Sequence, residues 1–251
     1  MNTFIDVFAS GSSISDEDVR NKIVVVIDVL RASSTIITAL QNGAKEVIPV
    51  EDMSAAGKIA QNLDASRYLL CGEKDGITID GYHLGNSPFE YVEEVVKGKT
   101  LILTTTNGTK AITKAQFAKK VIIAGFINAD AVIEELKKYN GDIAIICAGW
   151  KTRISLEDQL CAGYITRKLM QGVLPDNARD GARMAFVLSE KYQNQITEIV
   201  HLSNHAMRLI ELGYETDIAY CSQLNTTTVI PVLKEGTLIN DNGSEKSNTL
   251  R

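Results

Sequence analysis

The sequence predicts a three-layer α/β protein in which helices cover both faces of a largely parallel or mixed sheet. Short apolar runs alternate with segments of helical period over about the first 170 residues, and this alternation favours parallel strands joined by helices. The segment IVVVIDVLRASSTIITAL…KEVIPV is echoed by LILTTTNGTKAITKA…KKVIIAG, in the order strand, polar turn, helix, strand. We therefore expect a single domain over residues 1–251, and we leave open two similar βαβ halves at about 1–98 and 99–251.

The individual elements are predicted from the spacing of apolar residues. The strands span residues 4–8, 23–27, 46–50, 68–71, 100–103, 121–124 and 142–147. The helices span residues 33–41, 53–63, 88–96 and 131–139, with one more ending near 115 and another near 170. From 177 to 213 the pattern is nearly all helical, and strand formers return only at 218–221 and 229–233.

Several helix starts carry capping signals. Ser87 and Glu90 match the S-x-x-E capping box. A similar start begins at Ser155. Asn128 or Asp130 is predicted to cap the helix at 131–139, because short polar side chains accept hydrogen bonds from the first helical N–H groups.

Composition and charge exclude some classes of function. The chain is 45% hydrophobic with a net charge of -5, so a nucleic-acid partner is disfavoured, since phosphate backbones usually select a basic surface. A small anionic substrate remains compatible, because a bound metal or a local cationic pocket can outweigh the global sign.

The cysteine pattern and the first residues predict a reduced, cytoplasmic protein. The four cysteines are far apart and form no C-x-x-C pair. The first eleven residues, MNTFIDVFASG, lack the basic and apolar regions of a signal peptide. No apolar run approaches the ~18 residues of a membrane span, so we expect no membrane partner. Whether two copies form a homodimer is left open.

Polar residues follow most of the predicted strands. Because the carboxyl ends of parallel strands share one edge of a sheet, these residues should converge there. They are Asp28 and Arg31, Gly72 and Glu73, the run 104–109, Asn128, and Gly149 followed by Glu157 and Asp158. The sequence therefore predicts a polar site at this edge.

The turn after strand 23–27 combines opposite charges at the start of a helix. It carries Asp28, Arg31 and Ser33. A helix N-terminus attracts anions, and the planar fork of an arginine can clamp a phosphate, carboxylate or sulfonate. We interpret this turn as one half of an anion site.

The other half is predicted at the run Thr106, Asn107, Gly108 and Thr109, which directly precedes a helix. Here glycine allows a close approach of backbone N–H groups, so the run is typical of a phosphate cradle. The carboxylates are hard oxygen ligands suited to Mg²⁺, and the candidate metal ligands are Asp28, Glu73, Glu157 and Asp158. A metal would polarise a phosphoryl oxygen and activate water.

Structural roles stay open for several of these residues. Asp28 could cap the next helix, and Glu73 could be a solvated loop charge. Glu157 and Asp158 could be in the first turn of their helix only because the helix dipole stabilises acidic side chains there. The three histidines show no metal-ligand spacing. The sequence also lacks the Walker, dinucleotide and G-x-S-x-G motifs. A second Asp two residues after Asp28 is missing, so a nucleophilic Asp28 is left undecided.

The motifs together resemble the 2-phosphosulfolactate phosphatase family. The resemblance rests on IDVLRASSTI, CGEKDG, YHLGNSPFEY, TTTNGTKA, AGFINADAV and CAGWKTRISLEDQLCAG, in this order and spacing. It implies a cytosolic Mg²⁺-dependent phosphatase that converts 2-phosphosulfolactate into 3-sulfolactate and phosphate in coenzyme M biosynthesis. It also implies that the site includes Asp28, Arg31, Glu73, Asn86, Ser87, Asn107, Gly108, Thr109, Asn128, Glu157 and Asp158.

The leading hypothesis is hydrolysis of a phosphate monoester on a small acidic substrate. Catalytic roles are assigned to Asp28, Arg31 and Glu73, and the sulfonate and carboxylate are assigned to Arg31, Lys74 or Arg153. Lys74 stands where the family often has arginine, which would hold the sulfonate less rigidly. Two alternatives remain: a phosphatase for another phospho-acid, and a non-catalytic protein that binds small anions.

Overall fold

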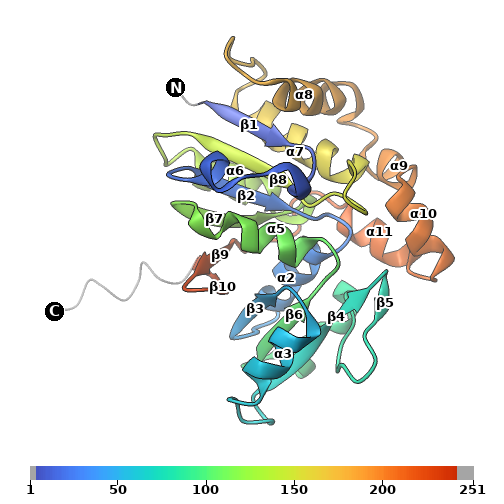
Figure 1. The fold of residues 1–251 in the computed structure, drawn as a ribbon. Helices are drawn as coiled ribbons and strands as arrows, with labels where there is room; N and C mark the ends of the chain where they lie inside the picture. Colours follow the sequence, from blue (N-terminus) through green and yellow to red (C-terminus); the bar gives the residue numbers. More distant parts are fainter. Residues whose placement is uncertain (1–3, 242–251) are drawn as a thin grey trace.

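A computed structural model describes residues 4–241 of the chain (Figure 1). Its strands form one mixed sheet with helices on both faces, as predicted. Along the sheet the strands lie in the order β1-β8-β2-β7-β9-β10-β3-β6-β4-β5. None of the helices in the described part is long and apolar enough to cross a membrane.

The strands match the predicted runs closely. Their bounds are β1 Ile5–Phe8, β2 Ile23–Ile27, β3 Glu46–Val50, β4 Tyr68–Lys74, β5 Ile77–Thr78, β6 Thr100–Thr104, β7 Lys120–Ala124, β8 Ile143–Cys147, β9 Pro231–Lys234 and β10 Thr237–Asn240.

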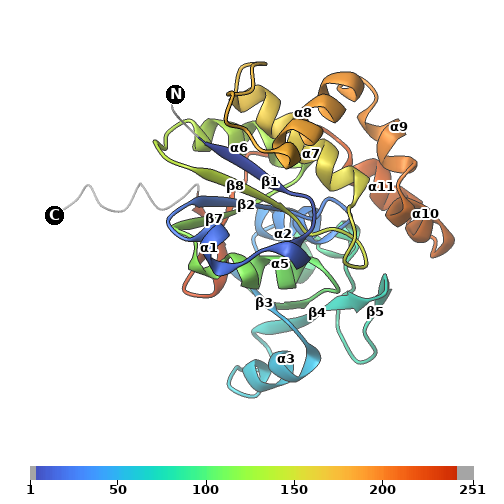
Figure 2. The same cartoon turned by 45° about the horizontal axis from the view of Figure 1, so that its top comes forward.

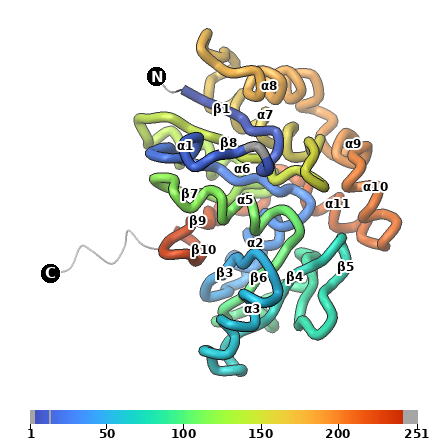
Figure 3. The backbone as a smooth tube through the Cα atoms, in the orientation of Figure 1, coloured from blue at the N-terminus to red at the C-terminus, as the bar shows by residue number. Residues whose placement is uncertain are grey.

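The sheet has two parallel blocks joined by a hairpin, and the short strand β5 pairs antiparallel with β4 at one edge. The first block is β1-β8-β2-β7 and the second is β3-β6-β4. The antiparallel hairpin β9–β10 connects them, pairing through Ile122 with Val232 on one side and through Val47 with Leu238 on the other. Figure 3 shows this hairpin beside β7. The blocks interleave in sequence, so the division into halves at about 98 stays a prediction.

In the sequence most helices follow a strand, and in space they cover the two faces of the sheet (Figure 1). Their bounds are α1 Asp16–Val19, α2 Ala32–Gln41, α3 Met53–Ala60, α4 Glu93–Val96, α5 Gly108–Lys114, α6 Ala129–Leu136, α7 Leu156–Leu169, α8 Asp180–Tyr192, α9 Ile196–His201, α10 Asn204–Glu211 and α11 Glu215–Cys221. Short 3-10 helices occur at Gly11–Ser13, Pro88–Glu90, Ala115–Phe117 and Phe126–Asn128.

Both faces of β2 are buried, because alternate side chains of a strand point to opposite sides. Ile23, Val25 and Ile27 pack with α6, α7 and α8 in one core. Val24 and Val26 pack with α2 and α5 in the other. A smaller third cluster lies under α3. Helices α9, α10 and α11 stand together at one side of the molecule (Figure 2), and residues of α10 line the cleft described below.

Three local predictions are wrong. The segment 88–96 is a 3-10 turn followed by the separate short helix α4, although Glu90 Oε1 accepts the predicted capping bond from Ser87 N at 3.4 Å. Residues 218–221 end the helix α11 and form no strand. Asn128 precedes α6 without a side-chain capping bond, because its side chain bonds to other backbone groups.

The contact between α7 and α8 depends on a glycine. A side chain at Gly163 would overlap the carbonyl oxygen of Ala185. We expect Gly163→Ala to lower the free energy of unfolding by about 2 kcal/mol or more, because the two helices must separate to admit the methyl group. Urea unfolding monitored by circular dichroism measures this change.

Gly57 in α3 is the matched control, since nothing lies within 4 Å of the position of its missing side chain. Gly57→Ala should raise the stability by up to about 1 kcal/mol, because alanine is the better helix former. Wild-type stability in Gly163→Ala would contradict this account of the helix contact.

Candidate active site

The polar ends of β2, β4 and β6 meet at a cleft of about 670 Å³, and residues of α10 line it as well. Of the predicted site residues, those that line it are Asp28, Arg31, Glu73, Asn86, Thr106 and Asn107. The predicted convergence of the strand ends is thus present in the structure, even though a hairpin separates β2 from β4 and β6.

Asp28 lies at the end of β2 against the first turn of α5. Its backbone N–H donates to Ser33 Oγ at 2.9 Å, and its Oδ1 accepts a hydrogen bond from Ala32 N at 3.3 Å. Among the described residues, none donates a hydrogen bond to Oδ2. A side chain at Gly108 would come within 2.7 Å of this oxygen, so the glycine is needed for the close approach of α5.

The carboxyl group of Asp28 is hard to ionise in this position. Burial is the main cause that raises its pKa to about 6. The charge of His205 opposes the rise, whereas the charges of Glu73 and Glu157 reinforce it. A cation in the cleft would therefore be drawn to this group of carboxylates.

Glu73 is fixed by the neighbouring turn. Its Oε1 accepts from Thr106 N at 2.7 Å, and its Oε2 accepts from Gly76 N at 2.7 Å and Thr106 Oγ1 at 3.0 Å. The preceding Gly72 has φ +146, and a side chain there would overlap the carbonyl oxygen of Thr104. Only glycine allows β4 and β6 to approach this closely, and the approach places Glu73 beside the predicted phosphate cradle.

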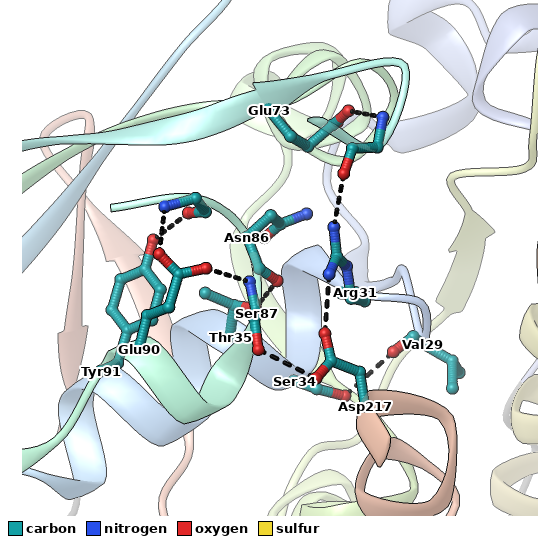
Figure 4. Close-up of polar contacts among 12 residues, drawn as sticks. Val29, Arg31, Ser34, Thr35, Glu73, Asn86, Ser87, Glu90, Tyr91 and Asp217 are labelled. Atoms are coloured by element: carbon teal, nitrogen blue, oxygen red, sulfur yellow. Dashed lines mark hydrogen bonds and ion pairs between the residues drawn. The ribbon is translucent and has the colours of Figure 1, made fainter. Parts of the chain in front are cut away.

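Arg31 is buried and bonds to Asp217 and to the backbone of Gly76 (Figure 4). Its Nη1 lies 2.6 Å from Asp217 Oδ2, and both side chains are only 2% exposed. Its Nη2 donates to the carbonyl oxygen of Gly76 at 3.1 Å, and its guanidinium lies 4.2 Å from the centre of the Tyr214 ring. The other carboxylate oxygen of Asp217 accepts from Ser87 Oγ at 2.9 Å. Arg31 therefore joins the sheet edge to α11.

A second polar group connects α7 with α10. His205 Nδ1 lies 3.2 Å from Glu157 Oε1, and the imidazole stacks on Trp150 with ring centres 5.7 Å apart. Burial raises the pKa of Glu157, but the hydrogen bond and charge of His205 lower it more, so the net shift is downward. With Nδ1 held by Glu157, Nε2 is the nitrogen that His205 has available for the cleft.

Asp158 bonds to the backbone. Its oxygens accept hydrogen bonds from Val29 N at 2.8 Å and Gly149 N at 3.1 Å, which ties the ends of β2 and β8 together. Burial, reinforced by the charges of Glu157 and Asp28, raises its pKa well above the usual range. The structure therefore places this predicted metal ligand behind the cleft.

Several other predicted residues also bond to the fold itself and do not line the cleft. Asn128 Oδ1 accepts a hydrogen bond from Gly125 N, and its Nδ2 donates to the carbonyl oxygens of Ile123 and Val229. Thr109 exchanges hydrogen bonds with Thr105. The further predicted residues outside the cleft lining are Ser33, Ser87, Gly108, Glu157, Lys74 and Arg153.

The sequence did not predict several of the cleft residues. Among them are Trp150, Lys151, His205, Arg208 and Glu211. The three histidines show no metal-ligand spacing in the sequence, but the structure places His205 in the lining of the cleft. Asp217 was not predicted as a site residue. The sequence pattern indicated strand formers at 218–221, whereas the structure has the helix α11 there, and Asp217 lies on this helix.

The donor set partly fits the expected Mg²⁺. No three His, Cys, Asp or Glu side chains in the described part of the chain could hold a metal ion together. Mg²⁺, however, often binds one or two carboxylates and completes its shell with water and substrate oxygens. Asp28 and Glu73 line the cleft, and the buried Asn86 Oδ1 has no hydrogen-bond partner among the described residues. These oxygens suit such an ion.

Comparisons with known proteins agree with the motifs. A family model described as 2-phosphosulpholactate phosphatase matches residues 9–236. A relative from Caldanaerobacter subterraneus subsp. tengcongensis, named "Probable 2-phosphosulfolactate phosphatase", is 42% identical over 93% of this chain and 96% of its own length. Relatives of the same name from Symbiobacterium thermophilum and Clostridium beijerinckii are 41% and 39% identical, over 89% and 92% of this chain and 96% and 97% of their own.

The raised pKa of Asp28 predicts that this residue costs stability at neutral pH. The native state holds the proton up to about pH 6 and the unfolded state only up to 3.8, so stability falls as pH rises through this window. Asp28→Asn removes this loss. Without metal, the stability of the variant relative to wild type should increase by on the order of 1 kcal/mol between pH 5 and pH 8.

Denaturant unfolding in EDTA at both pH values measures this difference. Asp52→Asn is a control, because Asp52 is an exposed cap of α3 and accepts from Ala55 N at 2.8 Å. A stability difference for Asp28→Asn that stays constant with pH would contradict the burial of a titrating carboxyl group at this position.

Proposed function

Because the chain belongs to the 2-phosphosulfolactate phosphatase family, we propose that it hydrolyses 2-phosphosulfolactate to 3-sulfolactate and phosphate with bound Mg²⁺. This is the reaction that the sequence resemblance assigns to coenzyme M biosynthesis, and a cytoplasmic location remains part of the proposal. The observation that supports it best is a cleft in which the buried Asp28 and Glu73 face the cationic side chains Arg31, Lys151 and Arg208.

The mixed charge of the cleft suits this substrate. Phosphate, carboxylate and sulfonate are all anionic, and a cleft with carboxylates alone would repel them. Asp28 and Glu73 would hold Mg²⁺, with Asn86 Oδ1 as a further neutral oxygen. Bound there, the ion would polarise the phosphoryl group and lower the pKa of water.

The turn before α5 is assigned to the phosphate. Asn107 lines the cleft, and the missing side chain of Gly108 leaves the backbone of the turn close to Asp28. Thr109 and Thr105 bond to each other across the turn, with Thr109 N donating to Thr105 Oγ1 at 3.0 Å. The turn is therefore preorganised, which favours binding of a charged group without rearrangement.

His205 is assigned the proton transfer to the leaving alkoxide. Glu157 orients its ring through Nδ1, and the stacked Trp150 holds the ring plane. A positioned histidine of this kind contributes roughly 10²- to 10⁴-fold to a rate. Asp28 is proposed as the metal ligand, and the nucleophilic role remains the alternative.

The direct test is phosphate release from 2-phosphosulfolactate. We expect turnover with Mg²⁺ and its loss in EDTA. A panel of other phospho-acids, ranked by kcat/KM, tests the first alternative. Tight binding of phospho-acids without turnover under any divalent metal would contradict the proposal and favour an anion-binding protein.

His205→Asn should lower kcat by on the order of 100-fold with a smaller effect on KM, because the proton donor is lost and the phosphate site remains. His201→Asn is the matched control, since His201 Nδ1 contacts only the carbonyl oxygen of Thr197, within its own helix. Equal activity of both variants would exclude the role proposed for His205.

A further inference from the structure

The carboxylate and the sulfonate of the substrate are not held by the residues assigned so far. Phosphate is assigned to the α5 turn and the metal. Arg31, the predicted anion clamp, already uses Nη1 for Asp217 and Nη2 for the carbonyl oxygen of Gly76, and its charge is balanced by a buried carboxylate. Another cation is therefore needed for a group that lies away from the phosphate.

Arg208 is the cleft cation that is most free to bind such a group. Its partner is Glu211, which is 68% exposed, with Nη1 and Oε2 3.2 Å apart. A solvent-exposed pair at this spacing is worth at most about 1 kcal/mol, so a substrate anion can replace it. Lys151 also lines the cleft, but its ammonium lies 4.8 Å from the centre of the Trp150 ring and lacks a planar fork.

The helix α10 presents Arg208 and His205 to the same place. The two residues are three positions apart, so they lie on one side of the helix, and both line the cleft. Ala206 and Leu209 of the same helix are 0% and 1% exposed and pack in the core. Arg208 is thus carried on a helix that the core holds in position.

We infer that Arg208 determines specificity by binding the sulfonate, an inference that rests on the proposed function. In 2-phosphosulfolactate the phosphate ester and the carboxylate are both attached to carbon C2. The sulfonate is attached to the neighbouring carbon C3 and so lies one carbon further from the phosphate. With phosphate at the sheet edge, this assignment places the sulfonate toward α10. A guanidinium binds two oxygens of such a group with parallel, charge-assisted hydrogen bonds.

The test compares 2-phosphosulfolactate with 2-phospholactate, which has a hydrogen in place of the sulfonate. Arg208→Gln should lower kcat/KM for 2-phosphosulfolactate by roughly 10- to 100-fold, mainly through KM, because one charge-assisted contact is lost. Its kcat/KM for 2-phospholactate should change less than threefold or so, on the same reasoning. Arg208→Lys should recover part of the loss, since it restores the charge without the fork.

Arg67→Gln is the charge-matched control. Arg67 is exposed just before β4, at the end of the strand opposite Glu73, and its substitution should leave both kinetic constants unchanged. If Arg208→Gln keeps the wild-type preference for 2-phosphosulfolactate, the inference is wrong although the proposed function stands. If it loses activity equally on both substrates, Arg208 does not bind the sulfonate.

Calorimetry separates this inference from the proposed function. Wild-type protein should bind 3-sulfolactate more tightly than lactate, and Arg208→Gln should lose that difference. If wild-type protein releases no phosphate from 2-phosphosulfolactate, the proposed reaction is wrong, and the calorimetry still decides whether Arg208 binds a sulfonate. Equal binding of 3-sulfolactate by wild type and Arg208→Gln would overturn the inference.

Discussion

The ion pair between Arg31 and Asp217 joins the turn after β2 to the helix α11. Both side chains are 2% exposed, so their removal from water is costly and is offset only by close, complete bonding. Ser87 Oγ bonds to Asp217, and the carbonyl oxygen of Gly76 accepts from Arg31. Four separate segments therefore meet at this pair, and α11, which carries Asp217, contacts the helix α10 that carries His205 and Arg208.

The charge of Arg31 is balanced by Asp217, whereas the carboxylates around Asp28 repel one another. Asp28 and Asp158 have raised pKa values because burial and neighbouring negative charge disfavour their ionised forms. Asp158 is needed by the fold, since it accepts two backbone hydrogen bonds. Asp28 has an oxygen that the described residues leave free of hydrogen bonds. A bound cation would favour the ionised form of Asp28 and so offset the cost of burying this carboxylate. The stability of the site is therefore linked to its proposed chemistry.

The sequence was sufficient for the strands and for the parts of the site that follow them directly. Asp28, Glu73 and Asn107 could be placed because the carboxyl ends of parallel strands share an edge. The hairpin β9–β10 and the helix α11 could not, because their positions depend on contacts with distant segments. Arg31 and Asp217 are 186 positions apart, and no local pattern indicates that they meet.

The same limit applies to the distinction between binding and structural roles. Asn128 and Asp158 are polar residues after strands, as the cleft residues Asp28 and Glu73 are, but the structure shows their side-chain atoms bonded to backbone groups. His205 was not predicted because the three histidines show no metal-ligand spacing, and the residue that contacts its ring nitrogen, Glu157, is 48 positions away. Local pattern thus identified the edge of the sheet, and tertiary contacts select the residues that face the cleft.

Hydrogen–deuterium exchange on Asp217→Asn tests most directly whether the ion pair holds the helical side of the site. Breaking a buried pair costs about 3 kcal/mol or more, so amide exchange in α10 should rise at least tenfold or so, above any rise in α7. Glu215→Gln, an exposed change on the same helix, should leave exchange at the wild-type rate. Unchanged protection of α10 in Asp217→Asn would contradict the account.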